Sequence, residues 1–174
     1  MIPTNRNRLQ YLLSTLLLLL LLPASACKGT DQIAETYDFR ALGEEMRTQK
    51  LPLLLAFRAD YCKYCRQLED EYLKPMKQSG KYAERILIHR FTLDYSGDIT
   101  DFNGKKLDAN EFSARYKASI TPTLVFVDAD GKEIAEALVG YNSPDFYGAY
   151  LENAIDTAYK AMQTGNEAKN GGAP

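Results

Sequence analysis

The spacing of hydrophobic residues changes several times along the chain, and each change predicts a different element. Residues 51–59 (LPLLLAFRA) form a continuous apolar run, which is typical of a strand covered on both faces. Residues 33–50, and the segment from Cys62 to Met76, instead carry apolar side chains at helical spacing. We therefore expect a helix on each side of a buried strand, with Pro75 kinking or ending the second helix.

The second half of the chain predicts a similar mixture of elements. Asp130–Gly131 lies between two apolar runs and indicates a hairpin. Ser143 is a plausible N-cap, with Pro144 at the first helical position after it. Parallel pairing through crossovers combined with antiparallel pairing through a turn predicts an α/β domain. The expected elements are a strand at 85–94, a polar loop at 95–106, a helix at 107–118, two strands within 121–141 and a helix at 143–162.

The N-terminus reads as an export signal rather than as part of that domain. Arg6 and Arg8 precede about a dozen apolar residues, a run shorter than the roughly 20 needed to cross a bilayer. Small residues then lead to Cys27, which resembles a bacterial lipoprotein signal in which the cysteine is acylated, although Ala24 replaces the preferred leucine. The alternative is ordinary cleavage, with Cys27 left as an unpaired thiol. The expected organisation is a signal peptide at 1–26, a tether at 27–31, one domain at 32–163 and a disordered tail at 164–174.

Charge and composition narrow the possible functions. The 174 residues suit one domain of ordinary size, and 45% hydrophobic residues are enough for a core. The formal net charge is −2, so the chain has no electrostatic basis for binding nucleic acid.

Two cysteines, Cys62 and Cys65, stand where the buried strand gives way to a helix. Unpaired backbone N–H groups at a helix N-terminus stabilise an anion, and thiols placed there have pKa values of about 3.5–7.5. We expect Cys62 to attack and Cys65, one turn further on, to resolve, with Lys63 adding positive charge. A c-type haem site is excluded because Arg66 follows the pair where a histidine is required. A zinc site lacks further ligands unless carboxylates contribute, and an inert structural disulfide remains a further alternative.

Three segments together resemble the thioredoxin superfamily. They are FRADYCKYC at 57–65, ITPT at 120–123 and DADGKEIAEALVGY at 128–141. The resemblance extends from Leu51 to Met162 and implies a thioredoxin fold, in which a central mixed sheet of four to five strands is flanked by helices on both faces.

The resemblance also implies roles for residues outside the cysteine pair. Pro122 should follow a cis peptide bond beside the dithiol, and the backbone of Thr121 should pair with an extended substrate segment. Gly140 matches the small residue that leaves room for substrate. Tyr61 stands where many relatives have tryptophan and would form an aromatic wall.

Two departures from the family pattern affect the expected chemistry. Relatives carry a buried acid six residues before the first cysteine, but this chain has Ala56 there. Glu69 or Asp60 would then be the proton acceptor for Cys65 through water; otherwise each is a solvated surface acid. The pair also encloses Lys63 and Tyr64, which should tune the thiolate. Tyr64, beside the second cysteine, and Thr121, before the proline, lean toward the exported reductase and isomerase branches.

The sequence thus predicts an exported thiol–disulfide oxidoreductase, a reductase rather than an oxidant. The expected partners are a disulfide-containing protein substrate, an unidentified membrane electron donor and the membrane itself through a lipid on Cys27. No metal or other cofactor is expected, nor any nucleic acid, and the chain should be a monomer in the periplasm. The alternatives are a thioredoxin-like adaptor or chaperone without redox turnover, and a metallochaperone. His89, in the strand at 85–94, is interpreted as a core-edge or surface residue.

Overall fold

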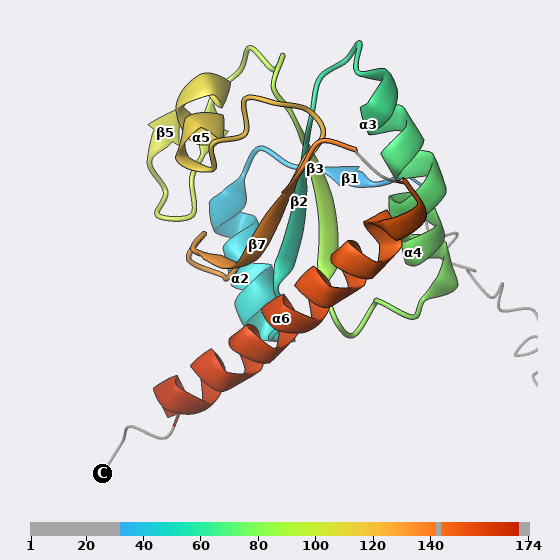
Figure 1. The fold of residues 1–174 in the computed structure, drawn as a ribbon. Helices are drawn as coiled ribbons and strands as arrows, with labels where there is room; N and C mark the ends of the chain where they lie inside the picture. The colour runs from blue at the N-terminus through green and yellow to red at the C-terminus, as the bar shows by residue number, and fades with distance from the viewer. Residues whose placement is uncertain (1–31, 142–143, 171–174) are drawn as a thin grey trace, which may run out of the picture. The chain divides into compact units, whose positions relative to one another are not determined.

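Five strands form one mixed sheet in the order β1-β3-β2-β6-β7 (Figure 1). The computed structural model describes residues 32–141 and 144–170. Strands β1, β3 and β2 are parallel, whereas β6 is antiparallel to both of its neighbours, β2 and β7. The predicted mixed sheet and the predicted hairpin between its last two strands are therefore confirmed. The strands are β1 (Ala34–Glu35), β2 (Leu53–Arg58), β3 (Leu87–Thr92), β6 (Thr123–Val127) and β7 (Glu133–Val139).

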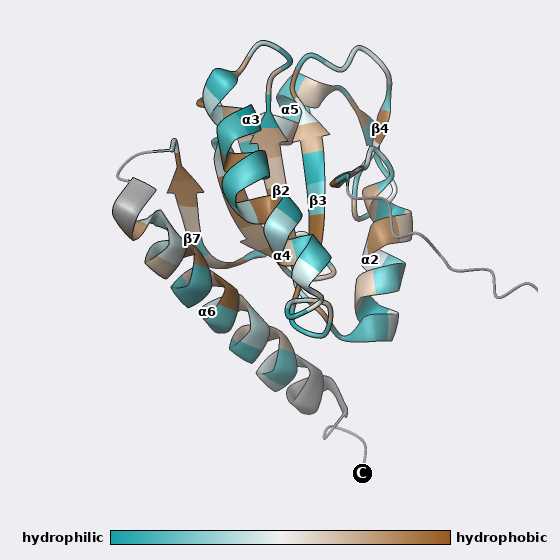
Figure 2. Ribbon diagram, turned by 90° about the vertical axis from the view of Figure 1, so that its right-hand side faces the viewer, coloured by the Kyte–Doolittle hydropathy of each residue, from teal (hydrophilic) through white to brown (hydrophobic). Residues whose placement is uncertain are grey.

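The central strand β2 divides the core into two parts, one on each face of the sheet. Leu53, Leu55 and Phe57 pack on the first face, against α2 and α5. Leu54 and Ala56 pack on the second face, against α3, α4 and most of α6. In Figure 2 the strands are largely hydrophobic and the exposed sides of the helices largely hydrophilic. The helices are α2 (Phe39–Gln49), α3 (Lys63–Leu68), the π-helical η1 (Glu69–Leu73), α4 (Lys74–Ser79), α5 (Ala109–Arg115) and α6 (Pro144–Asn170).

The first helix begins later than the sequence predicted. Residues Ala34–Glu35 form β1, which pairs in parallel with His89 and Arg90 of β3. The helix starts only after Asp38, whose carboxylate accepts a hydrogen bond of 3.0 Å from the N–H of Ala41. The prediction of a helix from residue 33 is wrong because this N-cap and the pairing with β3 outweigh the helical spacing.

The helical segment after Cys62 does not end at Pro75. It continues to Ser79, and the irregularity takes the form of the π-helical turn η1 directly before Lys74 and Pro75. Proline is tolerated here because it stands in the first turn of α4, where a missing N–H costs little. Met76 is buried with Leu68 on the second face of the sheet, as the helical spacing predicted.

The segment predicted as a polar loop contains a small hairpin of its own. Strands β4 (Ile99–Thr100) and β5 (Lys106–Leu107) pair antiparallel, with Ile99 opposite Leu107. Both of these side chains and Phe102 are buried in the core of the first face. Those three apolar residues anchor this segment to the core, so the prediction of a polar loop is wrong where β4 and β5 form.

The last helix is longer than predicted, and several N-terminal predictions fall outside the described residues. Helix α6 continues to Asn170. Within its last turns, the hydroxyl of Thr164 donates hydrogen bonds to the carbonyl oxygens of Lys160 and Ala161. Residues 164–170, which were predicted as part of a disordered tail, belong to α6 in the structure. Residues 1–31, with Cys27, and Ser143 lie outside the described part of the chain. Among the described helices, none has both the length and the apolar character needed to cross a membrane.

His89 lines a mainly apolar pocket of about 250 Å³ near the start of β3, whereas the two cysteines follow the carboxyl end of β2. Its Nδ1 atom is buried and has no hydrogen-bond partner among the described residues. Burial lowers the pKa of His89, and the charge of nearby Glu45 offsets only part of that effect. The interpretation as a core-edge residue fits this position.

We expect His89 to make the folded protein less stable as the pH falls below about 6.5. Below that value the unfolded chain binds a proton that the folded chain resists, so the free energy of unfolding decreases toward the folded-state pKa. Because His89 is the only histidine, His89→Gln should reduce the change of the free energy of unfolding with pH. Urea unfolding at several pH values between about 5 and about 7.5 measures that free energy. If it fell with pH as steeply in the variant as in wild type, the effect could not be assigned to His89.

Candidate functional site

A disulfide between Cys62 and Cys65 lies at the start of α3, directly after the carboxyl end of β2. The S–S bond is 2.02 Å long and the two Cα atoms are 5.2 Å apart. Cys62 has extended backbone angles and acts as the N-cap, because its sulfur accepts a hydrogen bond of 3.0 Å from the N–H of Cys65. The predicted position at a helix N-terminus is confirmed, and it is a position that favours negative charge on that sulfur.

The two sulfur-bearing residues differ in how far they are buried. Cys65 is 2% exposed, whereas Cys62 is only half-buried. An incoming disulfide can therefore approach Cys62 but not Cys65.

The loop between β2 and the disulfide is held by hydrogen bonds that the sequence analysis missed. The Asp94 carboxylate accepts a bond of 2.8 Å from the N–H of Asp60, and Arg66 donates one of 3.2 Å to the Asp60 carbonyl. Asp94 follows β3, and Leu93 donates a further 2.8 Å bond to the carbonyl of Arg58. Parallel strands end at the same edge of a sheet, so the position of Asp94 after the second parallel strand was the signal available in the sequence.

The loop before β6 lies next to the end of β2. The peptide bond between Thr121 and Pro122 is cis, which confirms the prediction made from the resemblance. Thr123 is the register partner of Phe57, so the cis bond comes at the edge of the sheet where the disulfide loop begins. Gly140 donates a 2.8 Å bond to the Pro122 carbonyl and has a φ of 79°, a conformation that itself favours glycine.

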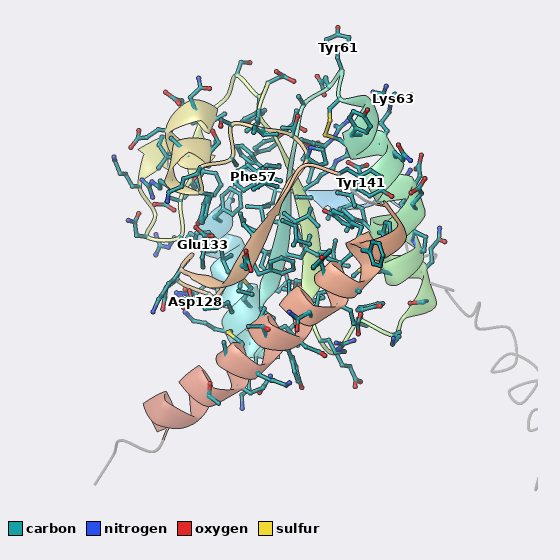
Figure 3. The ribbon with its side chains drawn as sticks, in the orientation of Figure 1. Phe57, Tyr61, Lys63, Asp128, Glu133 and Tyr141 are labelled. Carbon is teal, nitrogen blue, oxygen red and sulfur yellow. A yellow bond between two sulfur atoms is a disulfide. The ribbon has the colours of Figure 1, made fainter. Side chains whose placement is uncertain are left out.

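Several large side chains near the disulfide are open to solvent. Tyr61 is 96% exposed and projects from the loop before the disulfide (Figure 3). Tyr64 and Ile120 are also largely exposed, on α3 and before the cis bond respectively. Lys63 is exposed in the first turn of α3. This end of the molecule thus combines one accessible sulfur with exposed apolar side chains, as a surface that binds protein chains would.

The two candidate acids lie in different environments. Asp60 is exposed, as expected of a surface acid. Glu69 is only 6% exposed and forms ion pairs with Arg58 and Arg90, so its interpretation as a solvated surface acid is wrong. Ala56 is buried in the core of the second face of the sheet, at the position where the family pattern would place an acid.

Three tyrosines join α3 and its continuation to the chain segment that follows Gly140. The rings of Tyr72, Tyr141 and Tyr147 contact one another with centroids 4.9–6.2 Å apart. The hydroxyl of Tyr141 donates to Glu71, and its ring lies between β7 and α6 (Figure 3). Burial, followed by the hydrogen bond to the Glu71 carboxylate, raises the pKa of Tyr141. The cluster fixes α6 against the helix that carries the cysteines.

Metal ligands do not gather in the part of the chain that the structure describes. No group of three or more histidine, cysteine, aspartate or glutamate side chains there is arranged to hold a metal ion.

Comparisons with known proteins agree with this architecture. A family model described as a thioredoxin-like domain matches residues 40–155. A stretch of 93 residues is 27% identical to the disulfide bond reductase DsbH of Chlamydia pneumoniae and covers 53% of this chain and 55% of that one. The match thus spans about half the length of that curated relative.

Solved structures are also similar to this chain, at low sequence identity. A thioredoxin-fold protein from Helicobacter pylori is 24% identical, with a TM-score of 0.49, over 75% of this chain and 92% of that one. The periplasmic thioredoxin SoxS of Paracoccus pantotrophus is 21% identical, with a TM-score of 0.42, over 62% of this chain and 98% of that one.

Proposed function

The chain belongs to the family of thioredoxin-like domains, and from that premise we propose that it is an exported thiol–disulfide oxidoreductase acting on protein disulfides. The observation that carries the proposal is a disulfide at a helix N-terminus with one accessible and one buried cysteine, at the edge of the sheet where the cis-proline loop also lies. An inert structural bridge has no need of that asymmetry.

In the reductive direction the reaction has two sulfur-transfer steps. The Cys62 thiolate attacks a substrate disulfide, whose S–S bond breaks; one substrate sulfur leaves as a thiolate and takes up a proton, and the other is bonded to Cys62. Cys65 then loses its proton and attacks the Cys62 sulfur, which releases the second substrate thiol and forms the Cys62–Cys65 bond. Two electrons have passed to the substrate, and a separate donor must return them to the dithiol.

The residues around the disulfide have supporting roles in this proposal. The backbone of Thr121 pairs with an extended substrate segment, while Pro122 and Gly140 keep the approach to Cys62 narrow and free of side chains. Tyr61 provides an apolar contact for the substrate. Lys63 and Tyr64, inside the cysteine pair, tune the thiolate.

Direction and location are the finer parts of the proposal. A reductive role is supported by the name of the Chlamydia relative and by Tyr64 and Thr121, which lean toward the reductase branch. Export is supported by the pattern of residues 1–26, and a lipid on Cys27 would hold the domain at the membrane, close to a membrane electron donor.

The proposed activity is tested by insulin reduction with dithiothreitol as donor. We expect the wild-type protein to accelerate reduction and the Cys62→Ser/Cys65→Ser double variant to leave the uncatalysed rate unchanged. Equilibration with glutathione measures the reduction potential and so tests the direction of the reaction. A reductase should have a reduction potential close to that of thioredoxin, about −270 mV, and not close to that of a strong periplasmic oxidant, about −120 mV. No turnover with any donor, together with unchanged partner binding by the double variant, would instead identify an adaptor.

A further inference from the structure

The outer edge of β3 is only partly covered by another strand. Among the described strands, β1 is the one that lies beside this edge, and it pairs with His89 and Arg90. β3 begins at Leu87, so its first two residues extend past β1. A mainly apolar pocket of about 250 Å³ lies here, between α4, the turn that precedes β3 and the start of β3 itself. The pocket is open because β1 is only two residues long.

Most of the pocket wall is apolar and belongs to the core of the second face of the sheet. Met76 and Ile86 are buried members of that core, and Tyr82 and Ile88 pack against it. The volume of about 250 Å³ is slightly below the roughly 300–1,000 Å³ of pockets that hold drug-sized ligands. A pocket of this size and lining suits a small molecule with an apolar body.

Two nitrogen-bearing side chains in the same wall determine what polar group that molecule must carry. Lys77 is exposed on α4, and its ammonium group donates a hydrogen bond of 2.7 Å to the carbonyl oxygen of Gln32. An ammonium group has three donors, and no acid among the described residues forms an ion pair with this one. His89 Nδ1 is buried and has no hydrogen-bond partner among the described residues. Buried polar atoms are rarely left in this way.

The charges around His89 indicate that it lies within the electrostatic reach of Lys77. Burial lowers the pKa of His89, the carboxylate of Glu45 on α2 raises it in part, and the ammonium group of Lys77 on α4 lowers it again. Glu45 is exposed and accepts a hydrogen bond of 2.8 Å from Gln49 of its own helix. It does not line the pocket, so Lys77 is the one charged side chain among the described residues that do.

We propose that this pocket binds a small free monocarboxylate with an apolar body, such as a medium-chain fatty acid. The hydrocarbon part lies against Met76, Ile86 and Ile88, and the carboxylate accepts hydrogen bonds from Lys77 Nζ and His89 Nδ1. Neutral imidazole can carry its proton on either nitrogen, so Nδ1 can be a donor. Hydrogen bonds between ionised groups are about twice as strong as neutral ones, so the site should prefer an acid to an alcohol of the same length.

This site is separate from the disulfide. Leu87 at the start of β3 pairs with Leu53 at the start of β2, whereas the disulfide follows Arg58 at the other end of β2. A bound carboxylate should therefore leave insulin reduction unchanged. The two proposals can also fail independently of each other, because one is measured by binding and the other by turnover.

The test uses hexanoate as the ligand and His89 as the reporter. His89 is the only histidine, so its imidazole C–H signals can be followed by NMR in the whole protein. We expect hexanoate to bind with a dissociation constant in the range of about 1 mM or a few times that value, as suits so small a ligand. In saturating hexanoate the pKa of His89 should rise, because a neighbouring carboxylate favours the charged imidazolium. 1-Hexanol should bind about tenfold more weakly and should not raise that pKa, and acetate, which lacks the apolar body, should not bind.

Three variants assign the effect to the pocket. Lys77→Gln keeps an N–H donor for Gln32 but removes the charge, and it should weaken the binding of hexanoate about tenfold without affecting hexanol. Lys74→Gln is the matched control, because Lys74 lies on the same helix but pairs with Asp70 and does not line the pocket; it should bind hexanoate as wild type does. Ala83→Phe introduces a large side chain at an exposed position of the pocket wall and should prevent binding of both ligands.

Several results would overturn the proposal. They are equal affinity for hexanoate and hexanol, an unchanged pKa of His89 in saturating hexanoate, and the same affinity for hexanoate in the two lysine variants. Undiminished binding by a folded Ala83→Phe protein would also overturn it. If that variant does not fold, the comparison of Lys77→Gln with Lys74→Gln decides the question, because the first position is exposed and the second is largely so.

Discussion

The Cys65→Ser variant is expected to stop halfway through the reaction and to accumulate as a covalent complex with its substrate. Cys62 remains in place, half-exposed at the N-terminus of α3, and can still attack a disulfide. The buried sulfur that should release the substrate is absent, and serine oxygen is not a nucleophile for disulfides under these conditions. Cys62→Ser should show no such complex, because Cys65 is 2% exposed and no substrate sulfur can reach it.

Non-reducing electrophoresis and mass spectrometry after mixing each reduced variant with a disulfide-bonded protein measure the difference. Turnover in the insulin assay should fall to the uncatalysed rate for both variants, so only the trapped complex distinguishes them. The double serine variant is the control for non-covalent association. Trapping by Cys62→Ser, or equal trapping by both single variants, would show that the exposure of the two cysteines does not set their roles.

The features predicted correctly from the sequence are those with a local signal. The run at 51–59 is apolar throughout because β2 is central in the sheet and buried on both faces. Cys62 lies where a strand gives way to a helix, so its position at a helix N-terminus followed from neighbouring residues alone. The Asp130–Gly131 turn and the cis bond before Pro122 also belong to short segments that carry their own signature.

The features that were missed depend on which segments meet in space. Strands of two residues, such as β1 and β4, are too short to show a period and form because a partner strand is available. Glu69 lies in the acidic run EDE, and helical spacing alone does not separate the acid that faces the sheet from the two that face solvent. Its burial depends on Arg58 and Arg90, which reach it from two different strands. Asp94 likewise holds the disulfide loop only because β2 and β3 end at the same edge.

The second large effect is on stability: Phe112→Ala should destabilise the fold by about 3–5 kcal/mol. Phe112, on α5, is completely buried, and its ring centroid lies 4.2 Å from that of Phe39, 5.2 Å from that of Phe91 and 5.3 Å from that of Tyr116. The three surrounding rings, which come from α2, β3 and the end of α5, cannot all move inward to fill the space of the lost ring. A cavity would remain, and since domains of this size are stable by only about 5–15 kcal/mol, the loss is a large part of the total.

Phe146→Ala provides the matched control, because the same substitution at a residue that is 64% exposed should change the free energy of unfolding by less than about 0.5 kcal/mol. Urea unfolding of the two variants beside wild type measures both effects, with an unchanged denaturant slope required for the comparison. Phe112 packs on the first face of the sheet, whereas α3, which follows Cys62, contributes Leu68 to the second face, so at temperatures where the variant is folded its sulfur chemistry should match wild type. A loss below about 1.5 kcal/mol would mean that α5 and the β4–β5 hairpin can collapse onto the sheet, and that the aromatic cluster of the first face is less rigid than its packing indicates.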